Sequence, residues 1–300
     1  MNRIFTTATA VTALMAASGA FADGVAYRSV SLIYFTEDSA DLEAFLFEGA
    51  MDYQLGRFML SAATTYYDDG DFDGRNFSGS VGYEILPGLT GYVHVTTLDT
   101  EMFEETIYGL GVDYIGENLG VALHYGQQDE ADNEIYHLLG YVEFGPSTAY
   151  GSISRASDEN FFFAGYEYAV DTLDVAIGTE WSEEGLDEGN TSVMGHYRFL
   201  DRYEIMAGLT SDNDVLLEEG YLDLGFGYAL TEALTLEAAY TTTFGEDSPD
   251  MDLLTLALTF KTGPHRARVV DRYTDFVRDT TSYANKASGI DLYTPGMSFE

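Results

Sequence analysis

The chain has 300 residues, 51 Asp and Glu against 13 Lys and Arg, a formal net charge of −38, and no cysteine. Without cysteine, the sequence excludes a disulfide scaffold, a thiolate metal site and a cysteine nucleophile. The negative charge excludes nucleic acid as a partner, because phosphate neutralisation needs clustered Lys and Arg. The 23 Tyr and 19 Phe argue against disorder.

The first 22 residues have the pattern of a secretory signal. Arg3 precedes an apolar stretch from Ala8 to Ala17, and Ala20-Phe21-Ala22 forms a small-x-small cleavage site. A membrane anchor is the alternative, but the apolar run is too short to cross about 30 Å of hydrocarbon. We therefore predict that residues 1–22 are a signal peptide and that the exported chain begins near Asp23.

A change in charge divides the rest of the chain. Residues 23–260 contain 46 acidic and 6 basic side chains, a net charge of −40, whereas residues 261–300 contain 6 basic and 5 acidic ones, a net charge of +1. This boundary predicts one strongly acidic region over residues 23–261 and a separate C-terminal tail over residues 262–300.

The acidic region reads as a series of hairpins. Short turn candidates recur at intervals of about 30 residues, and longer, mostly acidic connections lie between them. Two strands fit in each interval, which predicts an up-and-down meander of sixteen strands, with fourteen as the alternative because the first hairpin is the least defined. The short turns are at 55–57, 86–88, 115–117, 145–146, 170–171, 200–202 and 230–232, and the acidic connections are at 36–40, 68–74, 99–104, 128–133, 157–160, 182–190, 211–219 and 245–250.

The two faces of each strand differ, because side chains alternate across a strand. One face is nearly all apolar, with aromatic residues near both ends of the strands, and the other is small or charged. A soluble β-sandwich also alternates, but strands of about ten residues and two aromatic girdles are typical of a barrel in an outer membrane. Examples of the apolar face are Phe77, Val81, Tyr83, Leu123, Ile177, Leu224, Phe226 and Leu254, and examples of the polar face are Ser78, Ser80, Ala122, His124, Asp174 and Asp223.

The predicted fold is therefore an all-β, transmembrane, antiparallel up-and-down β-barrel. Its apolar side meets lipid and its polar side meets a water-filled interior, which accounts for the mean hydropathy of only −0.09. Closure is required, because an open sheet edge in hydrocarbon would leave backbone groups unpaired. Sixteen strands make a barrel too wide for side chains to fill.

With a cleavable signal, about sixteen alternating segments, tight turns at one end, no cysteine and a terminal segment "LLTLALTF" ending at Phe260, residues 23–260 resemble the Gram-negative general porins. The resemblance implies an outer-membrane homotrimer that passes small hydrophilic solutes by diffusion. The sequence departs from the family in two ways. No predicted connection is longer than about nine residues, so the family's inward-folded third loop is missing, and forty residues follow Phe260, where the family normally ends.

The inward face should determine what the channel passes. It is rich in carboxylates, which attract cations, and at a Debye length of about 8 Å such charges still act on an ion in the pore. For any single carboxylate a merely solvated position is the alternative, so the predicted cation preference depends on the whole set. The predicted pore-lining residues are Glu48, Asp52, Glu84, Asp113, Glu143, Glu167, Asp174, Glu180, Glu204, Asp223, Glu237, Arg57, Arg198, His94, His124, His137 and His196.

We do not expect an enzyme. The four histidines named above all have the inward parity and lie far apart along the chain, with none in an outer loop beside a nucleophile. The alternatives to a general diffusion channel are a structural or adhesive outer-membrane barrel with acidic surface loops and a substrate-specific gated channel plugged by its C-terminal tail.

The acidic connections suggest divalent cations. "DGDFDG" places Asp69, Asp71 and Asp73 at alternate positions before Gly74, like the start of a calcium loop, but Ser80 stands where the bidentate Glu is required. A discrete metal site is therefore only weakly predicted. The simpler interpretation is that these carboxylates gather Ca²⁺ or Mg²⁺ at the surface and share them with lipopolysaccharide phosphates. No other cofactor is expected.

The tail contains a predicted amphipathic helix on the periplasmic side. Gly263-Pro264 is a helix-start signal, and the residues after it place apolar side chains on one helical face and arginines elsewhere. Such a stripe has to dock, which leaves three interpretations: residues 264–285 cap or enter the periplasmic mouth in place of the missing constriction loop, the helix binds another periplasmic partner or the cell wall, or the tail is largely disordered. The apolar residues are Val269, Val270, Tyr273, Phe276 and Val277, and the arginines are Arg268, Arg272 and Arg278.

Overall fold

The computed structural model describes residues 25–37, 42–100, 104–129, 133–156, 159–245, 251–263 and 268–287. The predicted signal peptide and the last thirteen residues of the tail lie outside them. The described residues form sixteen strands: β1 (Val25–Glu37), β2 (Leu42–Leu55), β3 (Phe58–Asp68), β4 (Asp73–Leu86), β5 (Leu89–Thr100), β6 (Glu104–Ile115), β7 (Leu119–Gln128), β8 (Glu134–Phe144), β9 (Ser147–Ala156), β10 (Glu159–Val170), β11 (Leu173–Ser182), β12 (Gly185–Phe199), β13 (Tyr203–Asp212), β14 (Gly220–Thr231), β15 (Leu234–Phe244) and β16 (Asp252–Thr262).

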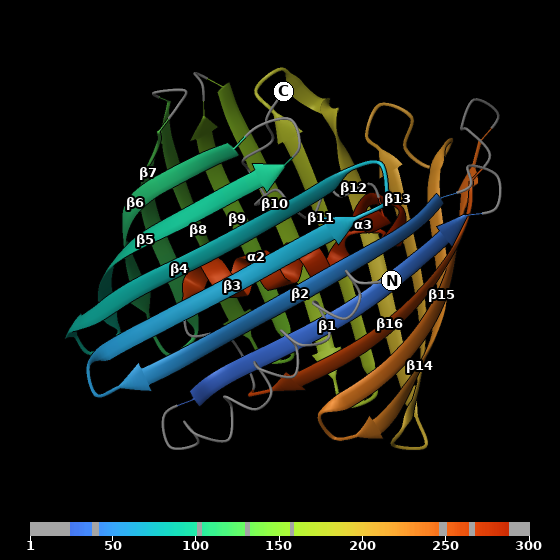
Figure 1. The fold of residues 1–300 in the computed structure, drawn as a ribbon, viewed down its shortest axis with the longest axis horizontal. Helices are drawn as coiled ribbons and strands as arrows, with labels where there is room; N and C mark the ends of the chain where they lie inside the picture. The colour runs from blue at the N-terminus through green and yellow to red at the C-terminus, as the bar shows by residue number, and fades with distance from the viewer. Residues whose placement is uncertain are drawn as a thin grey trace.

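The strands form a single closed barrel in which each strand pairs antiparallel with its neighbours in the sequence, as Figure 1 shows. The barrel closes where β1 meets β16, in a register that runs from Arg28 opposite Thr262 to Glu37 opposite Leu253. Closure pairs the backbone groups that an open edge would leave exposed to hydrocarbon. The predicted fold is confirmed, and the strand number is sixteen rather than fourteen.

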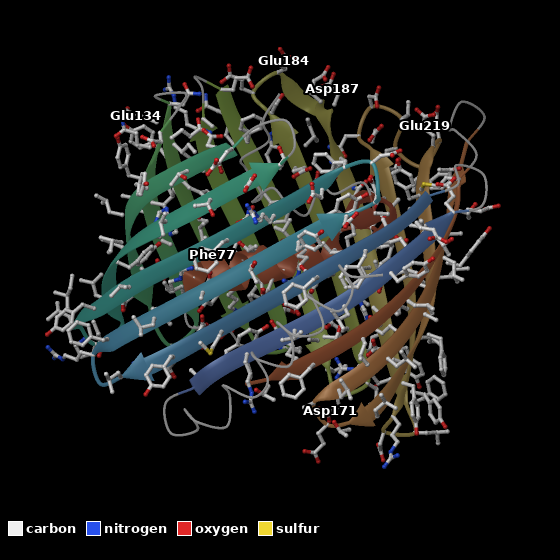
Figure 2. All side chains as sticks on the ribbon, viewed as in Figure 1. Phe77, Glu134, Asp171, Glu184, Asp187 and Glu219 are labelled. Carbon is white, nitrogen blue, oxygen red and sulfur yellow. The ribbon has the colours of Figure 1, made fainter. Side chains whose placement is uncertain are left out.

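The short turns gather at one end of the barrel and the acidic connections at the other (Figure 2). Gly56 and Gly88 have positive φ angles of 60° and 80°, which explains glycine in these turns. One predicted connection is wrong in extent. Residues 182–190 are mostly strand, because β11 continues to Ser182 and β12 begins at Gly185, so the hairpin extends its pairing and only residues 183 and 184 form the turn.

The outer surface is apolar. Leu123 is 58% exposed whereas its inward neighbour Ala122 is fully buried, and the same alternation places Phe77, labelled in Figure 2, on the outside. Aromatic rings pack together near both ends of the strands, with Tyr203 among Phe199, Phe226 and Tyr228 near the short turns and Phe162 stacked on Trp181 near the acidic end. A closed barrel with this surface is an outer-membrane barrel.

Two helices lie inside the barrel: α2 (Val269–Thr280) and the short α3 (Tyr283–Ala287). Figure 1 shows α2 crossing the interior, and it contacts the inner faces of β6, β7, β8, β11 and β12, whereas α3 contacts β2. Among the described residues, no helix is both long enough and apolar enough to cross a membrane. The predicted helix therefore exists, and its described part lies within the lumen.

Candidate functional site

The apolar face of α2 packs on an apolar part of the inner wall. Val269, Tyr273, Phe276 and Val277 are buried in one cluster with four wall residues. At its centre the Phe276 ring stacks on the Tyr150 ring, with centroids 4.0 Å apart and planes 15° apart. This contact removes from water the helical stripe that the sequence could not leave exposed. The four wall residues are Ala122, Leu139, Tyr150 and Phe163.

A glycine on β10 makes room for the central ring. A Cβ atom added to Gly165 would lie 2.3 Å from the Phe276 ring, which is closer than any real contact. β10 therefore has no side chain where the Phe276 ring lies against it. A side chain at this position would displace either the ring or the helix.

The wall also caps the start of the helix. Arg268, at the N-cap position, makes no side-chain capping hydrogen bond, and Asp113 on β6 instead accepts a hydrogen bond of 2.9 Å from the backbone N–H of Val269. Asp113 is almost fully buried, and its negative charge faces the positive end of the helix dipole. A residue of the barrel thus does what a capping side chain does in an isolated helix.

The arginines of the tail pair with carboxylates. Arg268 forms two hydrogen bonds with Asp271, of 2.5 and 2.7 Å, and both side chains are buried. Arg272 pairs with Glu143 on β8 and lies 4.1 Å from the centroid of the Tyr141 ring. These pairs let the arginines enter the lumen, because a buried charge without a partner would be strongly unfavourable.

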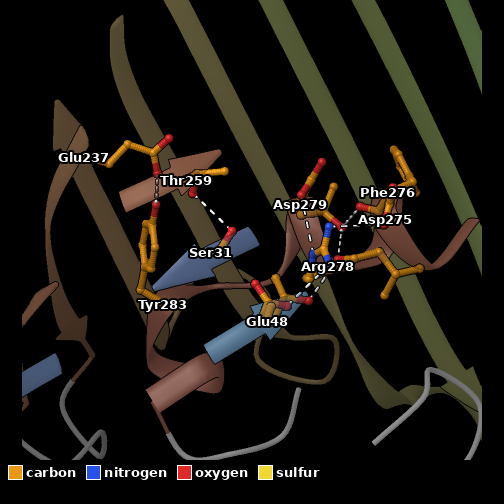
Figure 3. A network of polar contacts seen from close by, with 12 residues as sticks. Ser31, Glu48, Glu237, Thr259, Asp275, Phe276, Arg278, Asp279 and Tyr283 are labelled. Carbon is orange, nitrogen blue, oxygen red and sulfur yellow. Dashed lines mark hydrogen bonds and ion pairs between the residues drawn. The ribbon is translucent and has the colours of Figure 1, made fainter. Parts of the chain in front are cut away.

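The far end of α2 carries a second charge cluster, which Figure 3 shows. Arg278 lies 3.4 Å from Glu48 on β2 and 3.1 Å from Asp275 one turn earlier on the helix. In the next segment, the Tyr283 hydroxyl donates to Glu237 on β15 over 3.4 Å. These two strands are separated only by β1 and β16, and they lie across the barrel from β7 and β8, which α2 also contacts.

The described tail passes along the lumen from one end of the barrel toward the other. It begins against Asp113, two residues before β6 ends at the short-turn side. It ends at Ala287, whose carbonyl accepts a hydrogen bond of 2.6 Å from Tyr67, near the acidic end of β3. The helix therefore does more than cover one mouth, because the chain after it continues through the barrel.

A cavity of roughly 1700 Å³ remains beside the helix. Its lining includes Asp171 and Arg202 in the short turns and Glu180 and Asn190 near the acidic end, so it reaches both ends of the barrel. Polar and charged side chains make up much of the remaining wall, as water-filled space in a membrane barrel requires.

The charge of this lining has two sources. Thirteen acidic and seven basic side chains border the cavity. The strands and turns up to Thr262 supply ten of the acidic and three of the basic ones, whereas the tail after them supplies three acidic and four basic ones. The barrel wall is thus strongly negative, and the tail partly neutralises it.

Most of the predicted pore-lining residues border the cavity. These residues are Glu48, Glu167, Asp174, Glu180, Glu204, Glu237, Arg198, His94, His124, His137 and His196. His196 and Arg198 both pair with Glu204, at 2.9 and 3.0 Å. The roles of these residues in permeation stay predictions.

The other predicted residues are not part of the cavity lining. Asp52, Asp113 and Asp223 are buried, and Asp52 accepts a hydrogen bond from Ser61 over 2.5 Å. Parity identified their face correctly but could not show that other residues cover them. Glu143 is paired with Arg272, Glu84 accepts from the Gly88 N–H at a short turn, and Arg57 is exposed in the turn between β2 and β3.

One of the three predicted metal ligands, Asp69, has other partners in the structure. Asp69 accepts hydrogen bonds from the backbone N–H groups of Asp71 and Phe72, at 3.1 and 2.7 Å, and from the Tyr67 hydroxyl, at 3.0 Å. Within the described ranges, no group of three His, Asp or Glu residues is arranged to hold a metal ion. The geometry gives Asp69 the role of a turn cap, and a calcium or magnesium site that includes Asp71 and Asp73 stays a prediction.

The structure brings together three histidines that the sequence treats as separate. The His94 and His124 ring centroids are 5.8 Å apart, and those of His124 and His137 are 6.2 Å apart. They lie on β5, β7 and β8, beside the start of α2. Their shared inward parity places all three on the inner face of the barrel. Only the pairing register of the four consecutive strands β5 to β8 brings them to the same depth in the lumen.

The closed barrel, its apolar outer surface and the polar cavity beside an internal helix define a porin-like outer-membrane barrel. No family model matches the chain, and no curated protein matches it by sequence. The solved structures similar to it include Pseudomonas aeruginosa OpdQ, at a TM-score of 0.55 and 12% identity over 80% of this chain and 99% of that one.

Two further structures have the same fold. A mutant of Rh. blastica porin matches at a TM-score of 0.55 and 12% identity, over 80% of this chain and 99% of the other. Pseudomonas aeruginosa OccK5 (OpdH) matches at a TM-score of 0.51 and 10% identity, over 80% and 98%. At these identities the similarity shows the fold alone, so the homotrimer and the lipopolysaccharide contact stay predictions.

Proposed function

We propose that this protein is an outer-membrane channel for passive diffusion of small hydrophilic solutes and ions, that it prefers cations, and that its luminal helix sets the width of the passage. The observation that carries the proposal is the polar cavity that runs beside α2 and is lined by residues from both ends of the barrel. A structural or adhesive barrel does not need a polar passage along its length.

The charge of the lining supports the cation preference. Acidic side chains outnumber basic ones by thirteen to seven around the whole cavity, and by ten to three on the barrel wall alone. Fixed negative charge lining a narrow aqueous passage raises the local concentration of cations and lowers that of anions. The effect weakens with salt, because the screening length falls from about 10 Å at 0.1 M to about 3 Å at 1 M.

Planar-bilayer recording in a KCl gradient tests the selectivity. We expect a reversal potential of cation-favouring sign, with a larger magnitude at low salt. Glu167→Gln and Glu237→Gln, both on the cavity wall, should reduce it. Glu184→Gln and Asp187→Asn, at the exposed acidic end labelled in Figure 2, are matched controls that should leave it nearly unchanged. A reversal potential of anion-favouring sign would rule out the proposed preference.

Removing the tail tests the role of the helix. A chain that ends at Gly263 keeps all sixteen strands and the β1 to β16 closure. We expect its single-channel conductance to rise about twofold or more, because a helix about 10 Å across leaves the lumen. Its cation preference should also rise slightly, because four basic and three acidic lining residues are lost. Unchanged conductance in a correctly folded truncated barrel would refute the role of the helix.

The docked helix also favours a second candidate function, a gated channel in which the tail closes and opens the passage. A helix held by one apolar cluster and a few charge pairs can leave its site, whereas a loop within the barrel wall cannot. Single-channel traces distinguish the two candidates. A gated channel shows long closures that the truncated chain lacks, and a permanent constriction shows steady, lower conductance.

A further inference from the structure

The start of α2 rests on a group of buried, titratable side chains. His94, His124 and His137 are adjacent in space, and the Tyr92 ring lies 5.1 Å from that of His124. Asp113, which caps the helix, has its second carboxylate oxygen 3.8 Å from Nε2 of His124. The capping contact of the helix and the histidine group therefore share a residue.

The packing around these rings leaves little free space. A Cβ atom on Gly109 would lie 2.3 Å from the His94 ring, and one on Gly111 would lie 2.4 Å from the Tyr92 ring. β6 is bare at two consecutive inward positions, and the rings of β5 fill the space. The histidine group is thus a close-packed part of the wall. Its imidazole rings occupy space that aliphatic side chains would fill in an ordinary hydrophobic core.

Several polar atoms in this group are buried without a hydrogen-bond partner. They are Nδ1 of His94, Nε2 of His137 and Oδ1 of Asp113. A buried imidazole nitrogen without a donor or acceptor is unfavourable, so its presence calls for an explanation beyond packing. A proton taken up by His124 would give Oδ1 of Asp113 a donor, because Nε2 of His124 lies 3.8 Å from it.

The charges that face the group come from both the wall and the tail. Arg268 is buried and lies 5.3 Å from the centroid of the Tyr92 ring, and it is paired with Asp271. Asp52 on β2 interacts with Arg268 as well. Tyr273 lies 5.8 Å from the His137 ring, and burial raises the pKa of its phenol, so it stays neutral.

Proton uptake weakens the helix anchor whichever group receives the proton. If Asp113 is protonated, it loses the charge that favours its hydrogen bond from Val269. If His124 is protonated, its charge attracts the other oxygen of the same carboxylate, Oδ1 at 3.8 Å, and so pulls Asp113 away from Val269, which donates to Oδ2. If a second or third imidazole is protonated, positive charge accumulates around the buried guanidinium of Arg268, which is itself paired with Asp271.

We propose that Asp113, His94, His124 and His137 form an acid-sensitive latch that holds the start of α2 against the wall at neutral pH and releases it when the surroundings become acidic. The inference rests on the proposed function, since release changes conductance only if the helix narrows the passage. Apolar contacts around Phe276 keep the rest of the helix in the lumen, so release moves the first turns away from β6 and β7 without expelling the tail.

The test measures single-channel conductance of the full chain at pH 7.5 and at pH 4.0, corrected for the bulk electrolyte. The wild-type chain is expected to conduct about twofold more at pH 4.0, because the helix start occupies part of a lumen that is wider than a helix about 10 Å across. The triple variant His94→Gln, His124→Gln, His137→Gln should lose the part of this rise that depends on the imidazoles and keep only the part that depends on Asp113. His196→Gln should keep the full rise. His196 is a luminal histidine that pairs with Glu204, and the two lie on β12 and β13, away from the start of α2.

A single variant covers the case in which the triple variant does not fold. Asp113→Asn removes the charge at the helix start while keeping the shape of the side chain, so it should conduct more than the wild type at pH 7.5 and respond less to acid. A wild-type conductance that does not rise in acid, or a rise of unchanged size in the triple variant, would overturn the latch. If the truncated chain conducts no more than the full chain at pH 7.5, the proposed role of the helix fails instead.

Discussion

The two halves of the inner wall differ in what covers them. Along β7 to β10 the inward side chains include Ala122, Leu139, Tyr150 and Phe163, and the helix packs on them. Along β12 to β15 the inward side chains include charged residues such as Glu204 and Glu237, and these border the cavity. Apolar residues on the inward face of a wide barrel therefore mark the place where a further segment docks, because water alone would not favour them there.

Arginine on the lipid-facing side should be equally damaging in both halves, because the outer surface is the same on each. Leu123→Arg in the covered half and Leu224→Arg in the open half replace exposed leucines near the middle of their strands. Each should destabilise the barrel by about 2 to 4 kcal/mol near the midplane. Unfolding of the protein from lipid vesicles measures this free energy. A large effect in one half only would mean that the two outer faces differ.

Loss of the central apolar contact should affect the covered half alone. Phe276→Ala removes the ring that stacks on Tyr150 and should weaken docking of the helix by about 3 kcal/mol, the lower end for buried aromatic rings. Conductance should then rise toward that of the truncated chain, while the stability of the barrel changes little. Thr274→Ala, on the cavity side of the same helix, is the control and should leave conductance unchanged. Equal effects of the two variants would contradict the docking site.

The smallest expected effect concerns the charge pairs of the two halves. Arg272 and Glu143 join the helix to the covered half, and Arg198 and Glu204 pair within the open half. A double-mutant cycle with Gln should give a coupling of about 1 kcal/mol for the first pair and about half of that for the second, which is more exposed. Couplings of equal size would show that burial by the helix does not strengthen the first pair.

Much of the barrel could be predicted from the sequence, because the alternation that marks strands and the residues that mark turns are both local features. Alternation over about ten residues identifies a strand and its faces, and residues such as Gly56 and Gly88 identify the turns. The docking site of the C-terminal helix was harder to predict. Val269, Tyr273 and Phe276 predict an amphipathic helix, but helical periodicity does not say which surface the helix meets.

The sequence contained a further signal for the docking site. Leu139, Tyr150 and Phe163 have the inward parity, and in a polar lumen they are exceptions that need a cover. The group formed by His94, His124 and His137 could not be predicted in the same way. Parity places each ring inside the barrel, but its depth depends on the stagger between neighbouring strands, which a single sequence does not reveal.

The position of the tail inside the barrel also dictates an order of assembly. Val269 meets Asp113 across 156 residues of sequence, and Arg278 meets Glu48 across 230. Neither contact surface exists until the strands between have paired, so the helix must find its place after most of the wall has formed. Because β1 and β16 seal the wall, the tail then has only the short-turn mouth as its entrance, and its docking should be a late, separate kinetic step in refolding.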